Sequence, residues 1–192
     1  MFHRYAGRFV ALVITLLLAT SLWQLASAGW IQAKAVVAQQ LLQQSWQQTL
    51  DDGRIHKPWR WADTWPVARL EVPALNIEQV VLAGDSGSSL AFGPGLSSAS
   101  HLENGQGPIL ISGHRDTHFR FLQQLKTGDR LHLQTPSGTR YYTVNSFKIV
   151  DSRLFHLSVE YDTSLILSTC YPFEAIGSGG PLRYLVLANL SD

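Results

Sequence analysis

The sequence predicts a mostly β protein, a closed barrel or sandwich with short helices, preceded by an N-terminal transmembrane helix and a helical stalk. From Val67 onward, short β-like runs are separated by turn residues. A long uncharged run lies near the N-terminus, and all six tryptophans fall within the first 65 residues. We therefore expect a cytoplasmic tail and anchor at residues 1–30, a stalk and linker at 31–65, and the barrel domain at 66–192.

The uncharged run covers residues 9–33, which contain no Asp, Glu, Lys, Arg or His over 25 residues. Crossing a bilayer takes roughly 20 apolar residues, so this run is long enough. Arg4 and Arg8 precede it, and the positive-inside rule then predicts a single-pass protein whose N-terminus is cytoplasmic. The alternative is a signal peptide cleaved at residues 26–28 (Ala-Ser-Ala). Helix-forming residues continue through 31–50 without Pro or Gly, which favours retention of the anchor.

Residues 32–50 are Gln-rich, and their apolar side chains recur at helical spacing (Val37, Leu41, Leu42, Trp46, Leu50). We interpret them as a spacer helix that packs on its own domain or lies against the membrane, in preference to a partner-binding helix. Residues 51–66 lack periodicity and carry Gly, Pro and Trp, as expected for a linker that ends at the first strand.

The expected strands lie at residues 67–72, 76–83, 108–112, 130–135, 139–150, 164–169 and 183–190. Pro73 indicates that the first strand is bent or lies at an edge. Residues 135–138 (Thr-Pro-Ser-Gly) predict a hairpin turn. Residues 84–100 are rich in loop-forming residues, and residues 117–126 predict a short helix before Gly128.

Composition excludes several classes of protein. The net charge is +1 with both signs spread along the chain, which is unlike the basic footprint of a nucleic-acid-binding protein. A single cysteine forms no intrachain disulfide, and no Cys/His pattern has zinc-site spacing. Asp85 and Glu103 are isolated acidic residues, so we predict no calcium site, no other metal and no cofactor.

Three side chains have settings that suit catalysis. Cys170 follows an apolar run, where a thiol is held rigidly yet can face solvent, although a lone cysteine is more often a buried hydrophobe. His114 also follows a strand, and an imidazole there can pair with a thiol, but His118 lies four residues on and spacing alone does not choose between them. Arg183 begins the last strand and is either an oxyanion-stabilising cation or an ordinary surface arginine.

Three segments resemble, in chain order, the signature segments of the sortase family: ISGHRDTHF (111–119), LSTCYPF (167–173) and PLRYLV (181–186). GHRDTHF and TCYPF look most like class D-type sortases and their proteobacterial relatives. The fainter pattern LxVPxLxIxxVVLxG (70–84) and LAFGPG (90–95) is similar to the opening strands of the family. The resemblance covers about residues 65–190.

The resemblance implies an eight-stranded sortase-type β-barrel as the catalytic domain. Matched motif to motif, it implies that Cys170 is the nucleophile, His114 the acid/base and Arg183 the residue that stabilises the oxyanion. The family's histidine directly follows the glycine, and this selects between the two histidine candidates. We expect the neighbours Thr169 and Tyr171 to bind substrate.

The family cleaves a short sorting motif, often of LPxTG type, near the C-terminus of a protein substrate. It forms a thioacyl-enzyme and transfers the acyl group to an amine acceptor. The expected location is the cytoplasmic (inner) membrane with the catalytic domain in the periplasm. Alternatives are an exported cysteine peptidase that transfers to water and a non-catalytic, membrane-tethered β-barrel. Leu96 stands where related sequences carry His after GPG, and residues 171–182 are short and Gly-rich, so motif preference stays open.

Overall fold

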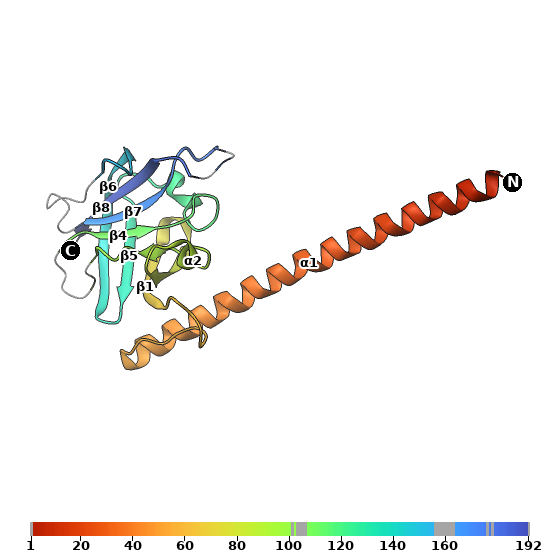
Figure 1. Cartoon of the computed structure of the whole chain (residues 1–192). Helices are drawn as coiled ribbons and strands as arrows, with labels where there is room; N and C mark the ends of the chain where they lie inside the picture. Colours follow the sequence, from red (N-terminus) through yellow and green to blue (C-terminus); the bar gives the residue numbers. More distant parts are fainter. Residues whose placement is uncertain are drawn as a thin grey trace. The chain divides into compact units, whose positions relative to one another are not determined.

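The computed structural model describes residues 2–100, 102, 107–155, 164–175, 177 and 179–191, apart from the side chains of residues 2–6, 10 and 11. One long helix, α1 (Phe2–Asp52), leads into a set of strands (Figure 1). The chain forms two compact units, residues 1–40 and residues 41–192.

The second unit is a closed eight-stranded barrel, so the predicted fold is confirmed. Going around the barrel, the order is β1-β2-β3-β4-β7-β8-β6-β5. The β2–β3 and β4–β7 pairs are parallel, and all other pairs are antiparallel. The strands are β1 (Pro66–Val72), β2 (Ile77–Ala83), β3 (Gly95–Leu96), β4 (Ile109–Ser112), β5 (Arg130–Thr135), β6 (Gly138–Asp151), β7 (Ser164–Cys170) and β8 (Leu182–Ser191). Short helical turns lie between them: η1 (Pro73–Leu75), α2 (Gly87–Leu90) and η2 (Arg120–Gln124).

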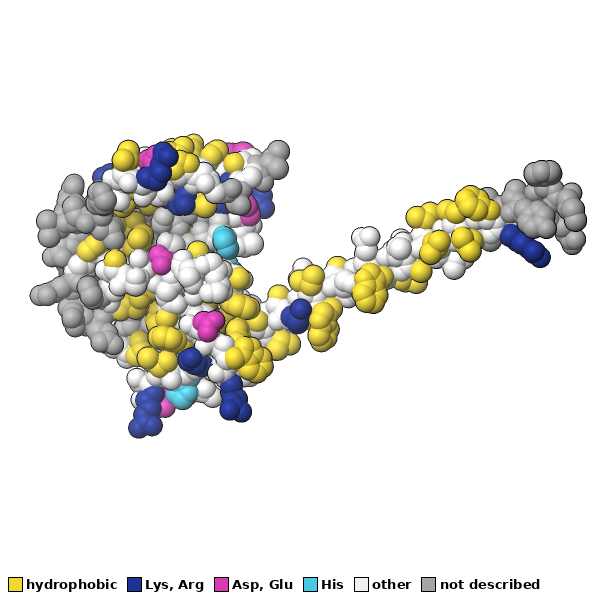
Figure 2. Space-filling model, viewed as in Figure 1, with side chains coloured by type: hydrophobic (Ala, Val, Ile, Leu, Met, Phe, Trp, Pro, Cys, Tyr) yellow, Lys and Arg dark blue, Asp and Glu magenta, His cyan; other side chains and the backbone are white. Residues whose placement is uncertain are grey.

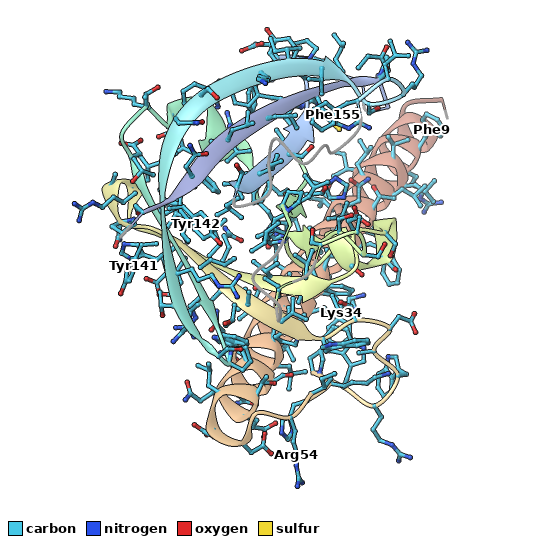
Figure 3. All side chains as sticks on the ribbon, turned by 90° about the vertical axis from the view of Figure 1, so that its left-hand side faces the viewer. Phe9, Lys34, Arg54, Tyr141, Tyr142 and Phe155 are labelled. Carbon is cyan, nitrogen blue, oxygen red and sulfur yellow. The ribbon has the colours of Figure 1, made fainter. Side chains whose placement is uncertain are left out.

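The barrel encloses one apolar core, because alternate side chains of each strand point inward. In β1 every second residue is buried from Pro66 to Val72. Neighbouring residues on β6 show the same alternation, since Tyr142 is 2% exposed and Tyr141 is 48% exposed (Figure 3). This regular wall gives the strand ends fixed positions, and the candidate site lies at those ends.

The turns refine the sequence predictions. The hairpin at residues 135–138 is confirmed, with Thr135 paired to Gly138 across the β5–β6 turn. Pro73 lies just beyond the end of β1 and begins η1, so it interrupts no strand hydrogen bond. β1 pairs with β2 on one side and with β5 on the other, and it is therefore no edge strand. Residues 84–100 include α2 and the two-residue β3, and the helix predicted at 117–126 is the shorter 3₁₀ helix η2.

The first unit is the N-terminal part of α1. Its side chains between Phe9 and Ile31 include many large hydrophobic groups that are exposed (Figure 2). The most apolar window of the helix has a mean hydropathy of 2.1 and none of it is buried. By length and composition, the helix can therefore cross a membrane, as either an anchor or a signal sequence.

The last three turns of α1 belong to the barrel unit. Leu42 is 1% exposed and Trp46 is fully buried, and both pack against Val80 and Leu82 of β2. The spacer helix thus packs on its own domain. Because these apolar side chains are buried on a strand, the compact unit begins at Leu41, which lies within the segment 31–65 expected as stalk and linker.

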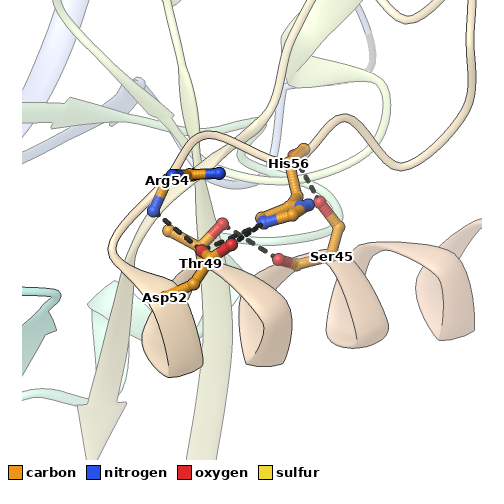
Figure 4. A network of polar contacts seen from close by, with 5 residues as sticks. All are labelled: Ser45, Thr49, Asp52, Arg54 and His56. Carbon is orange, nitrogen blue, oxygen red and sulfur yellow. Dashed lines mark hydrogen bonds and ion pairs between the residues drawn. The ribbon is translucent and has the colours of Figure 1, made fainter.

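Polar contacts hold the linker against the end of α1 (Figure 4). The Ser45 hydroxyl donates to the carbonyl of His56, and Thr49 Oγ1 donates to the carbonyl of Ser45 at 3.0 Å. The Asp52 carboxylate accepts from the Arg54 backbone N–H at 2.9 Å and lies 3.0 Å from His56 Nε2. These two partners, the Arg54 N–H first, lower the pKa of Asp52. The chain consequently turns back toward β1 directly after the helix.

Candidate active site

Cys170 is the last residue of β7, at the point where this strand leaves the barrel wall. The six preceding residues, Ser164–Thr169, are all buried, whereas Cys170 is partly exposed. The strand pairs with β4 on one side and β8 on the other. The thiol therefore sits on rigid backbone and still faces solvent, which is the setting required of a nucleophile.

His114 lies beside Cys170 because β4 and β7 run parallel. Ser112 pairs with Ser168, and both His114 and Cys170 follow this pair by two residues. The contact continues past the strand end, since the Gly113 N–H donates to the Ser168 carbonyl at 3.0 Å. His114 is exposed. The two side chains that sequence reasoning paired as base and nucleophile thus come from neighbouring strand ends.

Gly113 is needed for the backbone to reach this position. A Cβ placed on it would lie 2.6 Å from Cγ of Phe119, a fully buried ring. The Phe119 N–H also donates to the His114 carbonyl at 3.0 Å, so residues 114–119 form a turn that is closed by this bond. A buried aromatic ring against a glycine fixes the start of the histidine loop.

Arg183 lies directly opposite Cys170 in the β7–β8 pair, and on its other side it pairs with Val150 of β6. Its Nη1 donates to the carbonyls of Gly180, at 2.6 Å, and Leu182, at 2.9 Å. Cross-strand partners in an antiparallel sheet point to the same face. The three predicted catalytic residues therefore gather at one end of the β4–β7–β8 wall.

The two predicted substrate-binding neighbours differ from each other. Thr169 is 2% exposed, and its Oγ1 donates to the Gly113 carbonyl at 2.7 Å. This bond holds β7 against the histidine loop, and a contact of Thr169 with substrate stays a prediction. Tyr171 is half-buried, with its ring stacked at 6.3 Å from that of Tyr184 and edge-on to Phe173.

A cleft of about 410 Å³ runs along the outer face of the wall next to Arg183. Its lining residues are small or apolar, with Arg183 as the one charged group among them: Ser97, Ala99, Leu110, Ser112, Val150, Ser152, Phe155, Ser168, Arg183 and Leu185. Behind the cleft, Ile166, Leu185 and Leu187 form a buried apolar cluster that Phe155 helps to cover. Such a cleft suits an uncharged, extended peptide segment.

The remaining histidines with described side chains are engaged elsewhere. His118 Nδ1 is 3.2 Å from Gln79 Oε1, and burial, then the charge of His114, lowers the pKa of His118. His132 faces Glu71 at 3.5 Å, and His56 faces Asp52. Thus His114 is the described histidine at the end of the β4–β7 pair, whereas His101 and His156 lie outside the described residues.

Arg115, which sequence reasoning did not single out, is buried beside this site. Its side chain is 5% exposed and donates to the Asp116 carboxylate at 2.7 and 3.0 Å. It also donates to the carbonyls of Pro172, at 2.8 Å, and Ala175, at 2.7 Å. The guanidinium is close enough to Cys170 for a thiolate there to raise the pKa of Arg115, after the larger effect of Asp116.

Within the described residues, no group of three or more His, Cys, Asp or Glu side chains is placed to hold a metal ion. Asp85 is exposed, and Glu103 lies outside the described residues.

A closed barrel whose β7 ends in a cysteine, beside a histidine after β4 and an arginine opening β8, is the arrangement that the sequence motifs imply. In a comparison with known proteins, residues 70–191 match the sortase domain, and the chain belongs to the sortase family. It is 38% identical over 120 residues to sortase D of Bacillus subtilis (strain 168), a match that spans 61% of this chain and 60% of that protein.

Solved structures give the same result. Sortase A from Corynebacterium diphtheriae superposes with a TM-score of 0.58 at 25% identity, over 70% of this chain and 64% of that one. Sortase C of Streptococcus pneumoniae gives a TM-score of 0.56 at 25% identity, over 65% and 67%. Sortase C1 from Streptococcus suis, at 23% identity and a TM-score of 0.58 over 66% and 73%, shows the fold alone. The chain spans about three fifths of the length of the curated relative that it matches.

Proposed function

We propose that this protein is a membrane-anchored cysteine transpeptidase that cleaves an LPxTG-like motif near the C-terminus of a protein substrate and transfers the acyl group to an amine. The observation that carries the proposal is the register of β4, β7 and β8. It brings His114, Cys170 and Arg183 to one end of the wall, beside a cleft of small and apolar side chains.

In the first half-reaction, the Cys170 thiolate attacks the carbonyl carbon of the scissile peptide bond. The negative charge moves to the carbonyl oxygen, where the Arg183 guanidinium stabilises it. Both described bonds of this side chain use Nη1, which leaves its Nε and Nη2 donors for an oxyanion. The C–N bond then breaks, His114 gives its proton to the leaving amine, and a thioester remains on Cys170.

In the second half-reaction, the amine acceptor attacks the thioester carbonyl and His114 accepts its proton. The C–S bond breaks and the Cys170 thiolate is restored, so protons and electrons balance over the cycle. Water attacking in place of the amine gives hydrolysis. The chemistry at the strand ends is the same for both acceptors, and the acceptor decides between transfer and hydrolysis.

The apolar helix α1 supports a single-pass anchor at residues 1–30 with an N-terminus in the cytoplasm and the barrel in the periplasm. Arg8 precedes the apolar run, and the exposed Trp23 and Trp30 are of the type favoured at a membrane interface. A retained anchor keeps the barrel near the membrane, where newly exported substrates emerge. Full-length mass in purified membranes distinguishes this anchor from a signal peptide cleaved after Ala28.

Intact-protein mass spectrometry tests the function directly. The full chain in detergent is mixed with an LPxTG-type peptide library and an oligoglycine amine. We expect an acyl adduct on the wild type, a ligated product, and neither on Cys170→Ala. Hydrolysed peptide without ligation would identify a peptidase. An absent adduct together with an unreactive Cys170 thiol would identify a non-catalytic barrel.

Matched substitutions test the individual roles. His114→Ala should lose nearly all turnover, whereas His118→Ala, four residues away, should keep most of it. Arg183→Ala should lower turnover by about 10²–10³ with little loss of stability, which is the usual effect of removing an oxyanion donor. Wild-type turnover in either His114→Ala or Arg183→Ala would remove that residue from the mechanism.

A further inference from the structure

Arg115 is a buried cation next to the histidine loop, and its bonds explain how it is accommodated. Burying a guanidinium is unfavourable unless its donors are satisfied and its charge is balanced. Asp116 supplies the balancing charge through a two-pronged contact, with Nε to Oδ1 at 2.7 Å and Nη2 to Oδ2 at 3.0 Å. The Asp116 side chain is itself 69% exposed, so the pair bridges the surface and the interior.

The other donors of Arg115 reach a different part of the chain. Its Nη1 and Nη2 donate to the carbonyls of Pro172 and Ala175, which are 57 and 60 residues away in sequence. Both acceptors lie in the β7–β8 loop, just after Cys170. The residue that follows His114 is therefore bonded to backbone that follows the nucleophile.

Hydrogen bonds join the two segments both before and after Cys170 and His114 in the sequence. On the N-terminal side, the Gly113 N–H donates to the Ser168 carbonyl, and the Thr169 hydroxyl donates to the Gly113 carbonyl. On the C-terminal side, Arg115 bonds to the β7–β8 loop. Arg115 thus joins the loop directly to the histidine segment beyond the strand ends, whereas the packing of Phe173 on the core and the Tyr171 N–H bond to the Leu182 carbonyl hold the loop from elsewhere.

We propose that Arg115 is a positioning residue for the reaction: through the carbonyls of Pro172 and Ala175 it fixes the loop that follows Cys170 to the segment that carries His114. This inference rests on the function proposed above. It concerns geometry, because proton transfer between a thiol and an imidazole needs the two groups at hydrogen-bond distance. A misplacement of about 1 Å costs about 10²-fold in rate.

The charged groups around the Arg115–Asp116 ion pair come from the β7–β8 segment and from the segment that follows β4. Cys170 and Glu174 act on the Arg115 charge, and Arg120 and His114 act on Asp116. A variant that removes the charge as well as the bonds would mix two effects. Two substitutions are therefore needed: Arg115→Met removes both, and Arg115→Lys keeps the charge but loses the planar fork that reaches two carbonyls.

A matched control is Arg140→Met. Arg140 Nη2 also donates to a distant backbone carbonyl, that of Leu102 at 2.8 Å, but on β6 near the β5–β6 turn and away from Cys170. Both methionine variants remove one arginine that ties two segments together. Only the Arg115 variant does so at the strand ends of the candidate site.

The full chain in detergent is assayed for kcat and KM with the peptide and amine, and for the pH dependence of Cys170 alkylation by iodoacetamide, which needs no substrate. We expect Arg115→Met to lower kcat by about 10- to 100-fold with a smaller change in KM. Its alkylation profile should move toward that of an unpaired thiol. Arg115→Lys should fall between this variant and the wild type, and Arg140→Met should match the wild type.

A folded Arg115→Met protein with wild-type kcat and alkylation profile would overturn the proposal, as would equal losses in Arg115→Met and Arg140→Met. If Arg115→Met does not fold, Arg115→Lys decides between the outcomes. A wild-type kcat in Arg115→Lys would show that the hydrogen bonds to both carbonyls are not needed, and would overturn the proposal. If the wild type turns over no peptide, the proposed function fails. The alkylation profiles then still test Arg115.

Discussion

Replacing Trp46 by alanine tests whether the end of α1 is part of the barrel's core. The indole is fully buried against Val80 and Leu82, although it lies on the helix that begins in the apolar N-terminal run. If this contact holds the helix end to β2, its loss must lower the stability of the barrel unit. If residues 41–52 are only a spacer, the barrel will not respond.

The expected size follows from two opposing effects. Truncating a buried tryptophan to alanine usually costs about 3–5 kcal/mol. The Trp46 indole N–H, however, is buried without a hydrogen-bond partner among the described residues. An unmet donor costs about 1–3 kcal/mol, and the truncation removes that cost. We therefore expect the lower end, about 3 kcal/mol, and a smaller loss for Trp46→Phe, which loses the N–H but keeps one aromatic ring in the site.

The assay is thermal unfolding of the full chain in detergent, followed by near-UV circular dichroism. For a unit of about 150 residues, each kcal/mol moves the midpoint by about 2–4 °C, so Trp46→Ala should melt about 6–12 °C lower. Trp61→Ala is the matched control, because Trp61 is 80% exposed. Equal melting of the two alanine variants would show that the helix end does not stabilise the barrel.

Two further predictions concern the strand ends. Gly113→Ala should yield little folded protein, because its Cβ would lie 2.6 Å from the buried Phe119 ring, whereas Gly87→Ala, with no atom within 4 Å, should express and melt normally; equal yields would contradict this. Arg153 lowers the pKa of Asp151 from 3.8 to about 2, so their pairing stabilises the protein above that range and is lost as the pH falls toward 2. Between pH 5 and 2, the melting temperature of Arg153→Gln should therefore fall less steeply than that of the wild type. Parallel curves of melting temperature against pH for the two proteins would contradict this.

The barrel was predictable from the sequence because most of its strands carry their own signal. The alternating run that became β5 (Arg130–Thr135) and the Thr-Pro-Ser-Gly turn after it appear as predicted. The two-residue β3 was not predictable, since two residues have no period. Its place comes from pairing with Leu82 and Ser112, which the folded barrel supplies.

The candidate site was predictable where a motif names a residue, and less so where only packing assigns a role. Cys170, His114 and Arg183 gather as the motifs imply. Thr169 belongs to the same motif as Cys170, but its side chain is buried and donates to the Gly113 carbonyl, a contact that the residue type does not reveal. The available signal for Arg115 was its position directly after His114. Its acceptors are backbone carbonyls of Pro172 and Ala175, and such partners leave no trace in the residue types.

The placement of the three candidate catalytic residues also sets an order of assembly during synthesis. His114 and Cys170 lie on segments made before β8, yet β8 supplies Arg183 and joins β6 to β7. A nascent chain that has completed β7 holds a thiol and an imidazole but lacks the strand that seals the barrel beside them. The Arg183 guanidinium is added by the same strand that closes the barrel, so the growing polypeptide lacks one of the three candidate residues until the fold that confines them is also complete.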